Sequence, residues 1–393
     1  MEFWRRRKEK GKARECFLKT GSMFLKKLIA DCNGISNPIR MFSFDQISKA
    51  TDDPRCSILD GSSDFTWYKG VIEGKPYSIK IYRMEEMAYN DVVLSARVSN
   101  HSGFPKLIGC CLEYPLPVLV FEDLDDYKIL NERGSVGCED APLLPWNVRL
   151  KIAKEVAIAI TYLHTAFPRI IIHRNIKAEN VFLDKNGKAK LTDFSLAVTL
   201  PEGKSWIETK WSGTCGYIDS GYVLTVLVSE YTDVFSFGIL MLVLLIGRPG
   251  GLLISDGRWN IPSNISECVK DLQERGEPVE PVQMKLFLDL ALRCCDRSSG
   301  YQPKMIVVAK EIMLIEKVPL DSQMLENVSE DEGKSQMEDQ VMGWHGIFGS
   351  FLSPYRVDKF VELTFRCCER SVEKRPKMID VAKELKRIQR SLR

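Results

Sequence analysis

The stretch IIIHRNIKAENVFLDKNGKAKLTDFSLA, residues 170–197, decides how this sequence is interpreted. An apolar run leads into His173-Arg174-Asn175, which is followed by Lys177 and Asn180, and Asp193-Phe194-Ser195 lies near the end of the stretch.

The segments on either side of this stretch differ in character. Before it, residues 56–82 are rich in aromatic and β-branched residues around a Glu-Gly turn and predict strands, and a second strand pair is expected at 106–112 and 117–122. A helix is expected at 24–30, where apolar residues recur at helical spacing, and another at 84–98. Beyond residue 125 helices dominate, led by residues 146–164, whose apolar residues recur at helical spacing. The order predicts an α+β protein of two lobes.

The motifs of the decisive stretch resemble the catalytic loop and magnesium motif of protein kinases, HRDxxxxN and DFG. Tyr77-Ser78-Ile79-Lys80 is similar to the strand that carries the ATP-binding lysine, and 213–217 and 232–238 are similar to later segments of plant receptor-like kinases. The resemblance implies a bilobal protein-kinase-like fold, with a β-rich N-lobe at 41–124 and a helical C-lobe at 125–316.

Several positions depart from the kinase pattern. Asn175 stands where kinases have the aspartate that accepts the substrate's proton, and its amide has no useful basicity. The three glycines of the phosphate-covering loop correspond to Asp60, Ser62 and Phe65, and the valine that follows corresponds to Trp67. Side chains here obstruct the approach of phosphate to the backbone. The resemblance implies ATP and Mg²⁺ as cofactors, and these departures predict that their binding is weak or absent.

The retained polar residues define the candidate site, with Asp91 the best match to the helix glutamate that pairs with the kinase lysine. The candidate catalytic-loop residues are Asn175 and Lys177, and the candidate metal ligands are Asn180 and Asp193. The candidate nucleotide-binding residues are Lys80, Asp91, Asp60, Ser62, Phe65, Trp67, Phe121 and Asp123. The alternative is that these residues persist as a hydrogen-bonded network in an empty or blocked cleft.

The segment at about 195–217 corresponds to the kinase activation segment. Gly221 and Gln302 stand where the resemblance implies the glutamate and arginine of an anchoring ion pair. We therefore expect this segment to be mobile. Asp233 is expected to bind the backbone of the catalytic loop.

The C-terminal part of the chain contains an internal repeat. Residues 287–316 align with 360–389 at a constant offset of 73, with 16 identities in 30 positions. The sequence therefore predicts a duplicated C-terminal helix pair, with an acidic linker at 317–345 and the second copy at 346–393. Because only a short connection precedes the first copy, we expect that copy to complete the C-lobe.

Composition narrows the function classes. Hydrophobic residues make up 45% of the chain and charged residues 27%, which excludes wholesale disorder. A net charge of +2 gives no reason to expect nucleic acid, although the leader, residues 1–40, begins with a strongly basic segment that predicts peripheral membrane contact.

The adjacent cysteine pairs predict buried free thiols in a reducing compartment. The apolar run at 235–247 is too short to span a bilayer and predicts a core helix.

A closer resemblance is to the plant ZED-related kinases. It is carried by residues 17–53, by Trp67-Tyr68-Lys69-Gly70, by Gly109-Cys110-Cys111-Leu112 and by the His-Arg-Asn at 173–175. This resemblance implies a cytoplasmic pseudokinase, at the inner face of the plasma membrane if the leader binds lipid. It also implies an adaptor whose partners are a coiled-coil NLR immune receptor and an active cytoplasmic kinase. The alternative is a serine/threonine kinase of the receptor-like cytoplasmic class that retains ATP binding and activity.

Overall fold

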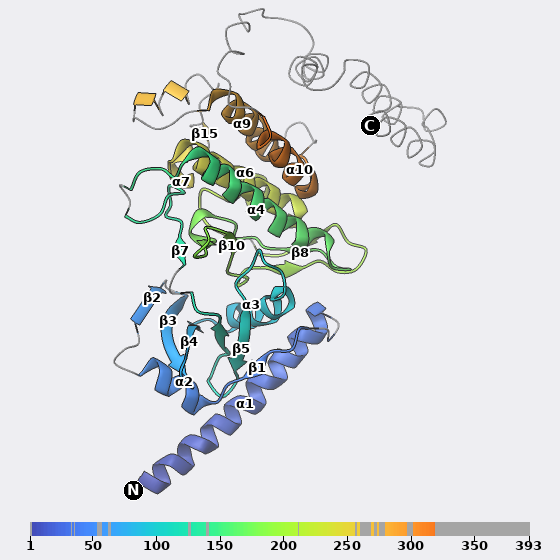
Figure 1. Ribbon diagram of the computed structural model, residues 1–393. Helices are drawn as coiled ribbons and strands as arrows, with labels where there is room; N and C mark the ends of the chain where they lie inside the picture. The colour runs from blue at the N-terminus through green and yellow to red at the C-terminus, as the bar shows by residue number, and fades with distance from the viewer. Residues whose placement is uncertain are drawn as a thin grey trace, which may run out of the picture. The chain divides into compact units, whose positions relative to one another are not determined.

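A computed structural model shows the arrangement of the chain (Figure 1). The chain divides into two units, residues 1–322 and 323–393, and the described residues all belong to the first. The structure describes residues 2–32, 34, 36–52, 57–61, 64–124, 127–138, 141–210, 212–255, 258–259, 269–270, 273–274, 280–296 and 302–318. Apart from residues 317 and 318, the predicted linker and the second helix copy lie outside the described residues.

The N-lobe is built on a six-stranded sheet with strand order β1-β5-β6-β4-β3-β2. β3 and β4 form a hairpin in which Ile72 pairs with Lys75, and Glu73 and Gly74 both have positive φ, as a two-residue primed turn requires. All neighbouring strands are antiparallel except β1 and β5. The strands are β1 (Arg40–Met41), β2 (Ser57–Gly61), β3 (Phe65–Ile72), β4 (Lys75–Tyr82), β5 (Leu107–Cys111) and β6 (Val118–Phe121).

Three helices accompany this sheet: α1 (Glu2–Cys32), α2 (Phe44–Thr51) and α3 (Glu85–Val98). α1 extends far beyond a helix of the apolar segment at 24–30, and its second half packs against α3 (Figure 1). Arg97 of α3 donates to the carbonyl of Asp31 at 3.0 Å, and Arg169 donates to that of Ala30. Two guanidinium groups thus satisfy carbonyls at the C-terminus of α1, where the helix dipole favours cations.

The C-lobe is helical, and its core helix is α6 (Glu230–Ile246), in which every residue from Thr232 to Ile246 is buried. This confirms the expectation that 235–247 is a core helix. No helix in the described part of the chain has the length and apolar character needed to cross a bilayer. α4 (Trp146–Thr165) packs on α6, and the fully buried Arg149 donates to the carbonyls of Leu244 and Leu245 at 2.9 Å.

The first copy of the repeated helix pair completes the C-lobe core, as expected. α9 (Pro281–Cys295) packs against α6, and α10 (Met305–Ile315) packs against α4 (Figure 1). Phe287 and Ile312 are fully buried. Cys110, Cys111, Cys294 and Cys295 are buried free thiols, which confirms that expectation for these two pairs.

Short elements connect these parts and position the catalytic-loop region. β8 pairs with β11 close to the two ends of the decisive stretch, and β9 pairs with β10 within it. These elements are β7 (Lys128–Ile129), β8 (Ile171–Ile172), η1 (Ala178–Asn180), β9 (Val181–Leu183), β10 (Ala189–Leu191), β11 (Val198–Thr199), β12 (Trp206–Glu208), α5 (Ser220–Thr225), β13 (Leu227–Ser229), α7 (Gly250–Leu253), β14 (Ile254–Ser255) and β15 (Arg258–Trp259).

Candidate functional site

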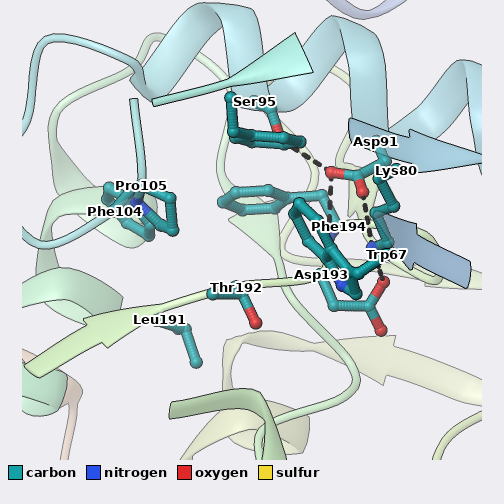
Figure 2. Close-up of a pocket in the computed structure, with 11 residues that line it drawn as sticks. Trp67, Lys80, Asp91, Ser95, Phe104, Pro105, Leu191, Thr192, Asp193 and Phe194 are labelled. Carbon is teal, nitrogen blue, oxygen red and sulfur yellow. Dashed lines mark hydrogen bonds and ion pairs between the residues drawn. The ribbon is translucent and has the colours of Figure 1, made fainter. Parts of the chain in front are cut away.

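Lys80 of β4 is the centre of the candidate site. Its side chain is 1% exposed, and its Nζ lies 2.9 Å from Asp91 Oδ2 and 3.0 Å from Asp193 Oδ1. Figure 2 shows the two carboxylates meeting the ammonium from α3 and from the segment after β10. The sequence therefore brings together a strand, a helix and a loop around one buried cation.

Asp91 faces Lys80, as its match to the helix glutamate implied. Its Oδ2 accepts a hydrogen bond from the Tyr82 hydroxyl at 2.6 Å, and its Oδ1 accepts one from Ser95 Oγ at 2.6 Å. The backbone N–H of Phe194 also donates to Oδ1, at 3.4 Å. Asp91 is thus bonded on both oxygens, which a buried charged group requires.

Asp193 is saturated in the same way. Its Oδ1 accepts from Lys80 and from the Tyr82 hydroxyl at 3.2 Å, and its Oδ2 accepts from Asn175 Nδ2 at 3.0 Å. Burial by itself would raise the pKa of the Asp193 carboxyl, but the Lys80 ammonium outweighs burial and lowers it. Asp193 has a φ of 72°, a left-handed conformation that non-glycine residues rarely adopt and that clusters at functional sites.

Aromatic rings surround the remaining side of the Lys80 ammonium. Its Nζ lies 4.1 Å from the ring centre of Phe65, 4.7 Å from that of Tyr82 and 5.3 Å from that of Trp67. Rings at these distances attract a cation. Burial opposes the charge, yet the two carboxylates raise the pKa of Lys80 above its ordinary value. The ammonium is therefore charged and fully engaged by the protein.

Asn175 connects the catalytic loop to two other parts of the site. Its amide donates to Asp193, its Oδ1 accepts from Thr214 Oγ1 at 2.8 Å, and its backbone carbonyl accepts from Asn180 Nδ2 at 2.7 Å. An amide donates and accepts at once, whereas a carboxylate only accepts. Lys177 lies nearby in the chain but pairs with Glu179 at 3.4 Å.

The catalytic-loop backbone is held by Asp233, as the sequence predicted. The backbone N–H groups of His173 and Arg174 each donate to its carboxylate at 2.8 Å, and the ring of His164 lies 2.9 Å from it. Asp233 lies in the first turn of α6, so the core helix sets the position of the catalytic loop. Burial lowers the pKa of His173, which favours its neutral form.

Arg174 ties the activation segment to the catalytic loop. Its guanidinium donates to the carbonyls of Leu196 at 3.2 Å and Lys210 at 2.7 Å and to the hydroxyl of Tyr222 at 2.6 Å. Two strands of this region, β12 and β13, also pair with each other. Because the glutamate–arginine pair is absent, the sequence predicted that the activation segment is mobile. In the structure the contacts of Arg174 hold this segment in place instead.

Gln302, which stands where the anchoring arginine was expected, has a different partner. Its Nε2 donates to the carbonyl of Cys294 at 2.7 Å. This bond joins the start of α10 to the end of α9. Gln302 therefore stabilises the helix pair itself.

One cavity beside Lys80, formed by described residues, is very small. It has a volume of about 10 Å³ and is lined by Trp67, Lys80, Asp91, Asp193 and the neighbouring aromatic residues (Figure 2). Such a space holds about one water molecule, whereas sites for small ligands occupy roughly 300–1,000 Å³. Trp67 packs against Phe121 at 5.1 Å and Phe182 at 6.2 Å between ring centres. These rings fill the space beside Lys80.

The structure describes two of the three remaining predicted nucleotide-binding residues. Asp60 lies in β2 opposite Trp67, Asp123 is exposed after β6, and Ser62 lies outside the described residues. Sequence reasoning missed Ser78, whose Oγ accepts from the backbone N–H of Leu124 at 3.0 Å. That hydrogen bond occupies a backbone donor beside Phe121 and Asp123.

As arranged, these residues do not fit a bound nucleotide with magnesium. Lys80 and Asp193 are the groups that would meet phosphate and metal, and both are already bonded to protein partners. No cluster of three or more His, Cys, Asp or Glu residues with metal-binding geometry occurs among the described residues. A nucleotide would have to displace these contacts.

A β-rich lobe with this lysine–carboxylate pair, joined to a helical lobe with this catalytic loop, defines a protein kinase domain. The protein kinase domain family matches residues 74–384, and the chain belongs to that family. Among its relatives are the ZED-related kinases of Arabidopsis thaliana. Serine/threonine-protein kinase ZRK1 is 50% identical over 79% of this chain and 95% of its own length.

Other relatives differ in what their names state. The Arabidopsis non-functional pseudokinase ZED1 is 42% identical over 79% of this chain and 99% of its own length. The Arabidopsis serine/threonine-protein kinase ZRK4 is 35% identical, and its alignment spans 99% of this chain and 98% of its own length. Kinases and pseudokinases are therefore both named among the relatives, so activity has to be argued from the site.

Proposed function

We propose that this protein is a pseudokinase that transfers no phosphate and acts as an adaptor in plant immune signalling. The observation that supports this most directly is the state of Lys80. Its buried ammonium is bonded to Asp91 and Asp193 and faces three aromatic rings. ATP would have to separate these charges inside the protein, where unpaired charges are costly. We therefore propose that ATP and Mg²⁺ bind weakly or not at all.

The residue at the position of the catalytic base supports the same proposal. Asn175 has no basic group, and loss of a general base alone lowers a rate by roughly 10²–10⁴-fold. Its amide is also bonded to Asp193 and Thr214. The side chain of Asn175 thus makes structural hydrogen bonds within the site and does not accept a proton.

The partners are proposed from the resemblance to the ZED-related kinases. We propose that a coiled-coil NLR receptor binds the kinase-like domain, and that an active cytoplasmic kinase modifies its activation segment. Candidate acceptors there are Ser205, Thr209, Ser212 and Thr214, with Lys204 and Lys210 as basic neighbours. The protein would act in the cytoplasm, and its basic leader would favour the inner face of the plasma membrane.

A transfer assay tests the loss of activity. Purified full-length protein is incubated with radiolabelled ATP and Mg²⁺, alone and with a generic protein substrate, beside an active kinase as control. We expect no label on either protein. Label on the wild type that disappears in Asp193→Asn would contradict the proposal.

A thermal-shift measurement tests nucleotide binding separately. A ligand at 100 times its dissociation constant stabilises a fold by about 2.7 kcal/mol. We expect no shift with millimolar Mg-ATP. A clear shift that is lost in Asp193→Asn would show that the site opens to nucleotide.

Co-precipitation tests the adaptor role. Binding to an NLR receptor is expected to survive Asp193→Asn, because it requires no turnover. If no NLR receptor is captured while a phosphorylated substrate is found, the adaptor proposal is wrong.

The second candidate function is a serine/threonine kinase with altered residues. The contact that favours this alternative is the Lys80–Asp91 ion pair. Active kinases require the equivalent ion pair, formed by a lysine and a glutamate. The relative ZRK1 is also named a serine/threonine-protein kinase. Under this alternative the site would open to ATP during turnover, and the transfer assay would detect label.

A further inference from the structure

The outer face of α10, the last helix of the C-lobe, is unusually apolar. Ile306, Val307, Met313 and Leu314 are 40%, 42%, 37% and 45% exposed. They lie at spacings of one and two helical turns, so they share one side of the helix. Single exposed apolar residues are common on protein surfaces, but a continuous stripe of them marks an interaction site.

The internal repeat provides a comparison within the same chain. At the buried positions of α10 the second copy keeps apolar residues: Met305, Val308, Ala309, Ile312 and Ile315 correspond to Met378, Val381, Ala382, Leu385 and Ile388. The apolar character of these positions is therefore kept in the sequence of both copies.

Three of the four exposed apolar positions differ between the copies. Val307, Met313 and Leu314 correspond to Asp380, Lys386 and Arg387, whereas Ile306 corresponds to Ile379. The repeated sequence therefore does not keep these three positions apolar. The apolar stripe of the first copy needs another explanation.

Charge indicates what covers the stripe. Lys310 lies on the same face and Lys317 follows one heptad later, both exposed, and neither has an ion pair with another described residue. By contrast, Lys304 pairs with Glu230 at 3.1 Å and Lys154 with Glu316 at 2.5 Å. Lys310 therefore lies between the two pairs of apolar residues and Lys317 lies beyond them, and neither has an acidic partner among the described residues.

We propose that this face, defined by Ile306, Val307, Lys310, Met313, Leu314 and Lys317, binds an amphipathic helix of a partner protein. The partner helix would carry an apolar stripe at the same spacing, and acidic residues beside it would pair with Lys310 and Lys317. The exposed face covers about two turns, which matches a short helix-on-helix contact. This site lies beyond the proposed adaptor function and holds whether or not the chain transfers phosphate.

The test uses full-length protein and a labelled synthetic helix with leucines at the stripe spacing and glutamates beside them. Binding is followed by fluorescence anisotropy. We expect the glutamate peptide to bind at least tenfold tighter than a peptide with lysine at those positions. The variant Val307→Asp/Met313→Lys/Leu314→Arg, which copies the second repeat, is expected to bind at least tenfold more weakly and to melt within a few degrees of wild type.

A charge-reversal variant guards against a folding defect. Lys310→Glu/Lys317→Glu leaves the apolar stripe intact and is expected to prefer the lysine peptide. Equal binding of both peptides to wild type, or unchanged binding to the triple variant, would overturn the proposal.

Cross-linking identifies any other occupant. A photo-reactive residue replaces Ile306 in the full-length chain, and its products are mapped by mass spectrometry. Products only with residues 319–393 of the same chain, or only with a second copy, would overturn the proposal in favour of self-association. A face that remains uncross-linked until the glutamate peptide is added would support it.

Discussion

The side-chain amide of Asn175 donates to Asp193 Oδ2 at 3.0 Å. Kinases have an aspartate at the first of these positions, and two carboxylates at this distance would repel each other in a buried site. The replacement therefore removes the catalytic base and creates an attractive contact with the magnesium-motif residue.

Restoring the kinase residue is expected to destabilise this protein. Asn175→Asp replaces a donor by an acceptor beside Asp193, which costs about 1–3 kcal/mol for an unsatisfied buried group. We expect a lower melting temperature and no gain of phosphate transfer. Thermal unfolding and the radiolabel assay check this, with the exposed Asn186→Asp as the matched control. A variant as stable as wild type would show that the Asn175–Asp193 bond contributes little.

Lys80 is expected to be a structural residue here. Lys80→Met leaves Asp91 and Asp193 as buried carboxylates without their cation, and breaking a buried ion pair in this way costs about 3–5 kcal/mol. Chemical denaturation measures the loss, and Lys75→Met at the exposed start of the same strand is the control. Adding Asp193→Asn to Lys80→Met is expected to recover part of the stability. A fully stable Lys80→Met protein would contradict this account.

The pH dependence of stability follows from Asp193. Its pKa lies below the ordinary value of 3.8, so between the two pKa values the unfolded state binds more protons. The contribution of Asp193 is therefore complete above about pH 4, near its unfolded pKa, and is lost as the pH falls further. We expect the stability difference between wild type and Asp193→Asn to be constant from pH 5 to 7 and to shrink below pH 4. A difference that grows in acid would contradict the lowered pKa.

The sequence predicted the fold because motifs fix both spacing and order. The strand and helix ranges of the N-lobe agree with β2 to β6 and α3, and Asp91 was found as the best match to the helix glutamate. Asp233 was also predicted, because its place at the start of the core helix matches a family motif. These features depend on local pattern and on resemblance.

The closed state of the site could not be predicted in the same way. Tyr82 bonds both Asp91 and Asp193, and the second of these lies 111 residues away in the chain. Ser78 accepts from Leu124 across 46 residues. Such contacts depend on the tertiary arrangement of side chains that carry no motif. The length of α1 was missed for another reason, because its first half lacks apolar periodicity, although its many lysines, arginines and glutamates favour helix.

Gly238 provides a test of the packing between α6 and α9. A Cβ at this position would lie 2.6 Å from Cys295 Sγ and 2.9 Å from Cys294 Cβ. Alanine is a better helix former than glycine by about 1 kcal/mol, but overpacking a core costs about 1–3 kcal/mol. We therefore expect Gly238→Ala to lower the melting temperature, while Gly11→Ala, at a position of α1 with open space around it, does not. Stabilisation by Gly238→Ala would mean that α9 does not pack there.

The last prediction concerns which helix copy closes the C-lobe. The family match extends to residue 384, within the second copy, whereas the structure packs the first copy into the core. Ile312 is fully buried, and Leu385 is its counterpart in the second copy. Burying an unpaired charge in place of an apolar side chain is among the most destabilising of substitutions.

The two copies therefore give a matched pair of variants in the full-length chain. We expect Ile312→Asp to unfold the kinase-like domain or lower its melting temperature by about 5 °C or more, roughly the effect of a loss of 3–4 kcal/mol in a domain of this size. Leu385→Asp is expected to leave the main transition unchanged, and deletion of residues 320–393 is expected to leave a folded protein. Differential scanning calorimetry measures all three. If Leu385→Asp unfolds the domain and Ile312→Asp does not, the second copy closes the core, because the two substitutions differ only in which copy receives the charge.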